Sequence, residues 1–198
     1  MKDTGIILLA AGNSTRMGTA KQLLIYQGKT LLDRMINTAL EVFYKNQIIL
    51  VLGANHHEIA SMITEKNISI SINNDWQSGM ASSIKSGLKT LIDRFPEMEK
   101  CFILVCDQPY LTSDLFLEML KLNESSKKEI IVAKYADILG VPALFSKKYF
   151  ENLLSLTGEQ GAKKIIQQNM KDVETFEFEK GAIDIDTKAD YENLKSKE

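Results

Sequence analysis

Short apolar runs alternate along the chain with segments in which apolar residues recur every three or four positions. The runs cover residues 5–10, 47–52 and 101–106, and each is largely continuous in its apolar character. Strands that are buried on both faces of a parallel sheet have this pattern. Between the runs, residues 31–43 and 80–91 have the spacing of amphipathic helices. The alternation predicts strand-helix-strand crossover units and a mostly parallel sheet.

Weaker patterns predict the remaining elements. Further strands are expected over 68–72, 129–133 and 173–178, and further helices over 147–156, 161–168 and 187–194. Turn residues follow the first two of these strands, at 73–75 and at 140–142. No internal repeat or linker interrupts the sequence. We therefore expect one domain over residues 1–198, of α/β class, with a three-layer α/β/α arrangement around a Rossmann-like sheet.

Charge and cysteine content limit the classes of partner. Lys and Arg total 24 and Asp and Glu total 26, for a net charge of −2, so there is no basic excess to bind a nucleic-acid backbone. Cys101 and Cys106 flank one apolar strand, where cysteines pack as small core residues, and buried thiols suggest a reducing compartment. The sequence shows neither a signal peptide nor the ~20 apolar residues of a membrane span. We expect a soluble cytoplasmic protein with no membrane or nucleic-acid partner.

The segment after the first strand, residues 11–21, has the composition of a phosphate-binding loop. Gly12 and Gly18 allow backbone amides to approach an anion, and Arg16 and Lys21 can neutralise a polyphosphate. The spacing of the two glycines and the lysine matches neither GxxxxGK[ST] nor GxGxxG. A solvated glycine turn between a strand and a helix remains the alternative.

Carboxylates follow the predicted sheet at the edge where open α/β sheets bind ligands. Asp107 comes directly after the third apolar run, and Asp184 and Asp186 lie two positions apart in an extended segment, on one face. Mg²⁺ usually takes one or two carboxylates together with substrate phosphates and water. The sequence predicts such a site at Asp107 with one of the other two carboxylates. The alternative is that each of these residues caps a turn or the start of a helix.

Together these segments resemble the MobA-like nucleotidyltransferase superfamily and, within it, the molybdenum cofactor cytidylyltransferase group. The matching segments are, in chain order, 9–18, 21–24, 74–83, 106–109, 158–162 and 184–187. The resemblance covers nearly the whole chain and implies the nucleotidyltransferase form of the Rossmann-like sheet. Ala10 and Ala11 before Gly12 resemble the cytidylyl group, because the guanylyl group has glycine at the second of these positions.

The resemblance also implies roles for individual residues. Arg16, Lys21 and Asp107 are the expected catalytic residues, and Asp107 and Asp186 are the expected Mg²⁺ ligands. The expected nucleotide-binding residues are Leu9, Ala10, Ala11, Gly12, Arg16, Lys21, Asp75 and Ser82. For Asp75 an Asx-turn, and for Ser82 a solvated first helical turn, remain alternatives. For Trp76, stacking on a base and packing of the loop both remain open.

The reaction implied is transfer of CMP from CTP to the terminal phosphate of molybdopterin, with release of pyrophosphate. A phosphate monoester has a second pKa near 6, so the acceptor is already ionised at pH 7 and no protein nucleophile is needed. Val141 stands where the family more usually has histidine, on the expected acceptor side. Three alternatives stay open: a sugar- or polyol-phosphate nucleotidyltransferase, a non-catalytic molybdenum cofactor carrier, and a nucleotide sensor. A molybdoenzyme is the expected client.

Overall fold

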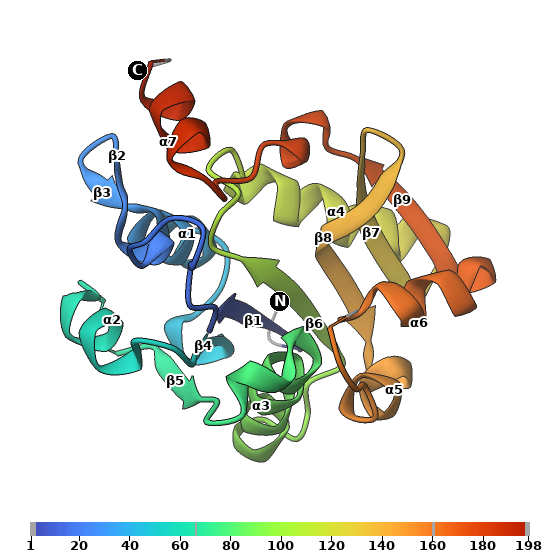
Figure 1. Cartoon of the computed structure of the whole chain (residues 1–198). Coiled ribbons are helices and arrows are strands. Elements are labelled where there is room, and N and C mark those ends of the chain that lie inside the picture. Colours follow the sequence, from blue (N-terminus) through green and yellow to red (C-terminus); the bar gives the residue numbers. More distant parts are fainter. Residues whose placement is uncertain (1–2, 66, 160, 197–198) are drawn as a thin grey trace.

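A seven-stranded sheet forms the centre of the computed structural model, which describes residues 3–65, 67–159 and 161–196 (Figure 1). In sheet order the strands are β5 (Ser69–Ile72), β4 (Ile48–Leu52), β1 (Thr4–Ala10), β6 (Lys100–Val105), β8 (Ile138–Ser146), β7 (Ile130–Tyr135) and β9 (Val173–Glu177). The helices are α1 (Leu31–Leu40), α2 (His56–Met62), α3 (Met80–Arg94), α4 (Ser113–Ser126), α5 (Phe150–Leu154), α6 (Lys163–Gln168) and α7 (Lys188–Lys195). A small hairpin pairs β2 (Ile25–Tyr26) with β3 (Lys29–Thr30).

The sheet is mostly parallel, as the apolar runs predict. Strands β5, β4, β1 and β6 pair in parallel, and β9 is parallel to β7 at the edge. Only β8 runs antiparallel to its neighbours β6 and β7 among the described strands of this sheet. Every residue of β1 and β4 is buried, which explains why their sequences do not alternate between apolar and polar positions.

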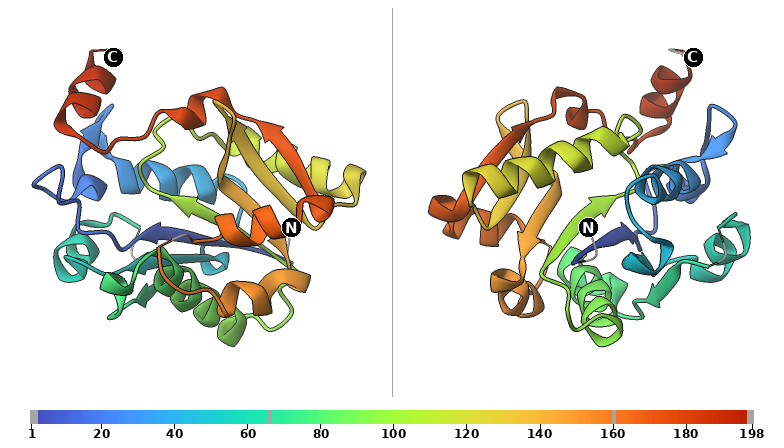
Figure 2. Two further views of the ribbon diagram at one scale, coloured as in Figure 1. Left: turned by 45° about the vertical axis from the view of Figure 1, so that its right-hand side comes forward. Right: turned by 180° about the vertical axis from the view of Figure 1, so that it is seen from behind.

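Helices cover both faces of the sheet, which gives the expected three layers (Figure 2). One face packs Ile6 and Leu8 of β1 against α1, α2 and α4, and the other packs Ile7 and Leu9 against α3, α5 and α6. Successive residues of a strand point to opposite faces, so one strand serves both cores. Cys106 lies in the first core and Cys101 in the second, and both thiols are free. None of the described helices has the length and apolar character needed to cross a membrane.

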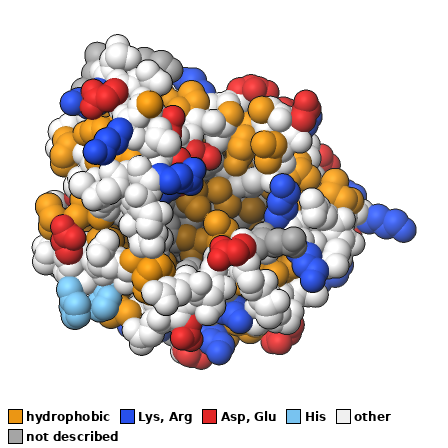
Figure 3. Space-filling model, in the orientation of Figure 1, with side chains coloured by type: hydrophobic (Ala, Val, Ile, Leu, Met, Phe, Trp, Pro, Cys, Tyr) orange, Lys and Arg blue, Asp and Glu red, His pale blue; other side chains and the backbone are white. Residues whose placement is uncertain are grey.

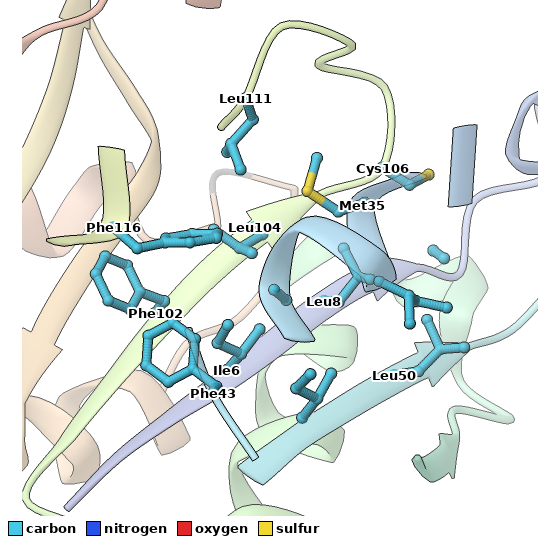
Figure 4. Close-up of a cluster of buried hydrophobic side chains, with 14 of the residues drawn as sticks. Ile6, Leu8, Met35, Phe43, Leu50, Phe102, Leu104, Cys106, Leu111 and Phe116 are labelled. Carbon is cyan, nitrogen blue, oxygen red and sulfur yellow. The ribbon is translucent and has the colours of Figure 1, made fainter. Parts of the chain in front are cut away.

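Three phenylalanines meet edge to face in the first core (Figure 4). The ring centroid of Phe102 lies 5.9 Å from that of Phe43 and 5.2 Å from that of Phe116, and Phe102 is fully buried. Phe102→Ala is expected to lower the free energy of unfolding by about 3–5 kcal/mol, measured by urea denaturation. The control Met170→Ala, at a side chain that is 51% exposed, should change it by less than about 0.5 kcal/mol. An equal effect of both substitutions would contradict this description of the core.

The prediction of a turn at residues 140–142 is wrong, because these residues belong to β8. The chain reverses instead at Ala136 and Asp137, whose φ angles of 46° and 62° suit a two-residue hairpin between twisted strands. Val132 pairs with Ala143, but the next residue of β7 pairs with Gly140, so two residues of β8 bulge out of the ladder. The two residues of the bulge are Val141 and Pro142. A proline is tolerated in a strand at such a bulge, because its missing N–H takes no part in the ladder there.

The C-terminal segment returns to the end of β6. Ile185 is fully buried, and its backbone N–H donates to the carbonyl oxygen of Asp107 over 3.1 Å. Thr187 and Asp190 then form a capping box at the start of α7, in which each side chain bonds to the backbone of the other residue. This return brings the residues around Ile185 to the carboxyl edge of the sheet.

Candidate active site

A pocket of about 520 Å³ opens at the carboxyl ends of β1 and β6. Figure 3 shows this face hollowed, with apolar side chains at the bottom and charged side chains around the rim. The residues that line it are Leu9, Ala10, Ala11, Gly12, Asn13, Ser14, Thr15, Arg16, Lys21, Gln22, Trp76, Gln77, Gly79, Met80, Ser83, Val105, Cys106, Asp107, Glu159 and Asp186. The loop of residues 11–21 therefore forms one wall, at the edge of the sheet where ligands of open α/β sheets bind.

Gln22 holds the loop of residues 11–21 in its folded form. This side chain is only 1% exposed, and its Nε2 donates to the carbonyl oxygens of Ala10, over 2.9 Å, and of Gly12, over 3.1 Å. The Oγ of Ser14 accepts a hydrogen bond from the backbone N–H of Lys21 over 3.1 Å. The sequence pattern gave Gln22 no role, because its polarity alone does not show that it folds back onto the loop.

Lys21 lies between two carboxylates that are distant in the sequence. Its Nζ donates to Oδ2 of Asp107 and, over 2.9 Å, to Oδ1 of Asp186. Arg16 donates from Nη2 to Oδ2 of Asp186, also over 2.9 Å. The Lys21 and Asp107 side chains are only 18% and 14% exposed, whereas Arg16 is 68% exposed. Four residues expected from the sequence to carry phosphate and metal chemistry thus meet at one point of the pocket.

The pKa shifts follow from these contacts. Desolvation by burial opposes the charge of Lys21, but the charge of Asp107 and the hydrogen bonds to both carboxylates outweigh it, and the pKa of Lys21 is raised. Desolvation likewise disfavours ionised Asp186, yet its bonds to Lys21 and the nearby Arg16 leave its pKa lowered. Lys21 is therefore a cation and Asp186 an anion at neutral pH.

Asp184 lies beside these charges but does not line the pocket. Desolvation and the charges of Asp107 and Asp186 raise the pKa of Asp184 to about 6, and Lys21 and Gln108 partly oppose the rise. Of the two carboxylates that the sequence left open, the structure brings Asp186 into contact with Lys21. The backbone N–H of Asp186 is bonded to Asp190 over 3.2 Å, so helix capping leaves its own carboxylate directed to the site.

The carboxylates suit a cation that takes its remaining ligands from a substrate. Oδ1 of Asp107 is buried without a hydrogen-bond partner among the described residues, although the other oxygen of the same carboxylate is bonded to Lys21. Within the described ranges, no group of three or more His, Cys, Asp or Glu side chains could hold a metal. Two carboxylates with substrate phosphates and water are a usual Mg²⁺ environment. The donor set at Asp107 and Asp186 therefore fits such an ion only together with a phosphate ligand.

Asp75 and Ser82 lie outside the pocket lining, unlike the other expected nucleotide-binding residues. Oγ of Ser82 donates to the carbonyl oxygens of Asp75, over 2.9 Å, and of Gly79, over 2.8 Å. These bonds hold the turn that leads into α3. The neighbouring Ser83 is buried, accepts a hydrogen bond from Asn73 over 3.0 Å and lines the pocket.

The opposite wall contains Trp76, for which stacking on a base and packing of the loop were both open, and two residues to which the sequence pattern gave no binding role. The side chains that line it are those of Trp76, Met80 and Glu159. Trp76 and Met80 belong to the matched segment 74–83, and Glu159 belongs to the matched segment 158–162. Gly79, with φ of 96°, joins the segments, because a Cβ there would lie 2.8 Å from the carbonyl oxygen of Gly158. Gln160, which belongs to the second motif, lies outside the described residues.

Comparisons with known proteins agree with this geometry. Residues 6–173 match the family described as the MobA-like NTP transferase domain. The molybdenum cofactor cytidylyltransferase of Escherichia coli (strain K12) is 30% identical over 194 residues, which cover 96% of this chain and 95% of that protein.

Solved structures show the same fold over almost the full length. The crystal structure of Rv0371c from Mycobacterium tuberculosis H37Rv aligns with a TM-score of 0.83 and 28% identity, over 98% of this chain and 96% of that chain. A complex of Rv0371c with manganese aligns with a TM-score of 0.77 and 26% identity, over 98% and 97% of the two chains. The family match and the 30% identity to a cytidylyltransferase over nearly the full length show that this chain belongs to the MobA-like NTP transferase family and is a nucleotidyltransferase.

Proposed function

We propose that the protein transfers CMP from CTP to the terminal phosphate of a molybdopterin-type acceptor and releases pyrophosphate. The observation that carries this proposal is the position of Lys21, whose Nζ bonds to both Asp107 and Asp186 beside the loop of residues 11–21. A cation between two carboxylates, next to a phosphate-type loop, is suited to binding a triphosphate with a metal. The near full-length similarity to the E. coli cytidylyltransferase supports CTP and the molybdenum cofactor as substrates.

The nucleotide is proposed to lie against Leu9, Ala10, Ala11 and Gly12. A volume of about 520 Å³ is within the usual range for small-molecule sites. Apart from Gly12 itself and its two chain neighbours, no described residue has an atom within 4 Å of the place where a Cβ on Gly12 would stand, so a phosphate can approach the backbone there. Asp75 and Ser82 contribute indirectly in this proposal, by holding the turn before α3.

Mg²⁺ is the proposed cofactor, with Asp107 and Asp186 as the residues that would hold it. The buried, unpartnered Oδ1 of Asp107 is the atom best suited to such a ligand among the described residues. When bound, the ion would supply neutralisation of phosphate charge and orientation of the triphosphate. The manganese complex of Rv0371c supports a divalent ion in a protein of the same fold.

The reaction then needs position and charge rather than a protein nucleophile. An oxygen of the acceptor phosphate attacks the α-phosphorus, a new phosphoanhydride bond forms, and the bond between the α-phosphorus and the leaving pyrophosphate oxygen breaks. Lys21 and Arg16 stabilise the negative charge that passes to the leaving group. Asp107 accepts a hydrogen bond from Lys21 and so fixes the position of the cation that stabilises the leaving group.

The acceptor wall is the part of the site where this chain departs from its family's pattern. Val141 lies in the bulge of β8, and its half-buried side chain packs on the second core. An apolar residue there in place of histidine favours a different contact to the acceptor. A sugar or polyol phosphate is therefore kept as the second candidate for the acceptor.

A non-catalytic carrier or a nucleotide sensor is disfavoured, because neither needs a lysine held between two carboxylates. A molybdoenzyme is the proposed recipient of the product.

The two candidates are separated by the acceptor that releases pyrophosphate. The protein is incubated with Mg²⁺, with each of the four nucleoside triphosphates and with molybdopterin, its metal-containing form, or sugar and polyol phosphates. Release from CTP with a molybdopterin acceptor is expected. Release only with a sugar or polyol phosphate would transfer the assignment to the second candidate, and binding of CTP without release under any acceptor would indicate a sensor.

A further inference from the structure

Gln108, the residue after Asp107, connects three separate parts of the fold. Its side chain is only 2% exposed. Its Nε2 donates to the carbonyl oxygen of Val141, over 3.1 Å, and to that of Gly181, over 3.0 Å. One amide group therefore joins the end of β6 to the bulge of β8 and to the 3-10 helix of residues Glu179–Ala182. The first of these parts carries Asp107, the second is the proposed acceptor wall, and the third leads to Asp186.

The orientation of this amide is determined by its partners. These two partners are carbonyl oxygens, which accept and cannot donate, and the amide also opposes the rise in the pKa of the Asp184 carboxyl, so its NH₂ group must face these acceptors. The Oε1 atom is then buried without a hydrogen-bond partner among the described residues. Leaving a buried acceptor unpaired typically costs about 1–3 kcal/mol. An apolar side chain would avoid this cost but would leave the carbonyl oxygens of Val141 and Gly181 without their donor, so the amide is needed for the connection between these segments.

The segment that Gln108 contacts is tightly docked. A Cβ on Gly181 would lie 2.6 Å from the ring of Phe178 and 2.7 Å from the ring of Tyr135, so the backbone itself packs against these residues. Four residues further on, the N–H of Ile185 donates to the carbonyl oxygen of Asp107. The stretch from Gly181 to Ile185 is thus attached at both ends to Asp107 and Gln108, two consecutive residues of the turn after β6, and the next residue is Asp186.

We infer that Gln108 is a positioning residue, which keeps Asp186 and the Val141 bulge in register with Asp107. Gln108 does not line the pocket, so its effect on the reaction is indirect. The inference rests on the proposed function, in which Asp107 and Asp186 act on one triphosphate. Residues that hold metal ligands in place typically contribute 10–100-fold to activity or to metal affinity.

The test uses Gln108→Met, which keeps the length of the side chain and removes both hydrogen bonds. We expect kcat for pyrophosphate release to fall about 10–100-fold. The KM for the nucleotide, which the loop of residues 11–21 binds, should stay unchanged. Amide hydrogen exchange across residues 181–187 should become faster, because the attachment at Gly181 is lost. Gln108→Glu, which replaces the donor with an acceptor, should show the same changes if the methionine variant does not fold.

Asn123→Leu is the matched control. Asn123 is also a buried amide, and its Nδ2 donates to a backbone carbonyl, that of Lys128, at the end of α4. This variant should lose stability without any change in kcat or in exchange at residues 181–187. Unchanged exchange in the Gln108 variants, or faster exchange with unchanged kcat, would overturn the inference. If the wild-type protein releases no pyrophosphate from any donor, the proposed function fails, and the exchange measurement alone decides whether Gln108 holds the segment.

Discussion

Asp107→Asn is expected to lower turnover at least about 100-fold, the usual minimum for loss of a preorganised electrostatic group in an active site. The substitution keeps the shape of the side chain but removes the negative charge that Lys21 contacts and that a divalent ion would need. Since the side chain is only 14% exposed, water cannot replace the lost charge efficiently. Pyrophosphate release at saturating nucleotide and acceptor measures the effect.

A second aspartate provides the control for this prediction. Asp172 accepts hydrogen bonds from Lys148 and Tyr149, each over 2.6 Å, and does not line the pocket. Asp172→Asn removes a carboxylate that also accepts from a lysine, so it matches the chemistry of the change but not its location. Its turnover should equal that of the wild type. Turnover of Asp107→Asn within about tenfold of the wild type, with an unchanged melting temperature, would contradict the role given to Asp107.

Lys21→Ala is expected to change two properties in opposite directions. Turnover should fall at least about 100-fold, because the cation that meets the triphosphate is lost. Binding of Mn²⁺ to the nucleotide-free protein should become tighter, because Lys21 no longer neutralises Asp107 and Asp186. Turnover is measured by pyrophosphate release, and Mn²⁺ binding by titration calorimetry or by the electron paramagnetic resonance signal of the free ion.

Lys148→Ala is the corresponding control, since Lys148 forms an ion pair with Asp172 away from the pocket. Neither its turnover nor its Mn²⁺ affinity should differ from the wild type. Weaker or unchanged Mn²⁺ binding in Lys21→Ala would show that the lysine and the ion do not share the two carboxylates. Near-wild-type turnover in the same variant would remove Lys21 from the reaction.

The buried strands could be predicted from the sequence because their apolar runs carry the signal locally. Strands β1, β4 and β6 are apolar on both faces, and so is most of β7. The hairpin between β7 and β8 was not predictable in the same way. Ala136 and Asp137 form its turn without a glycine, and the register shift that admits Pro142 depends on the pairing of two strands.

The members of the charged cluster could be predicted, but their contacts could not. Lys21 is 86 residues from Asp107 and 165 residues from Asp186 along the chain. Spacing rules reach only as far as one element, so they favoured neither Asp184 nor Asp186 by geometry. The structure distinguishes them through the return of the chain at Ile185, whose N–H donates to the carbonyl oxygen of Asp107 and which places Asp186 beside Lys21.

The prediction that Ser82 binds the nucleotide had the same limit. Both Ser82 and Ser83 accept from Asn73, but only Ser83 lines the pocket. Adjacent residues of a helix point about 100° apart, so the rotation of α3 decides which hydroxyl faces inward. That rotation is set by the turn at Gly79, where φ is 96°.

The central claim is that the loop of residues 11–21 and the carboxylates Asp107 and Asp186 form one site for a triphosphate and a divalent ion. The most direct measurement is pyrophosphate release from CTP with a molybdopterin acceptor, with and without Mg²⁺, in the wild type and in Asp107→Asn. We predict release that requires acceptor and Mg²⁺ together and that falls at least about 100-fold in the variant. Release that is independent of Mg²⁺, or equal in both proteins, would contradict the claim.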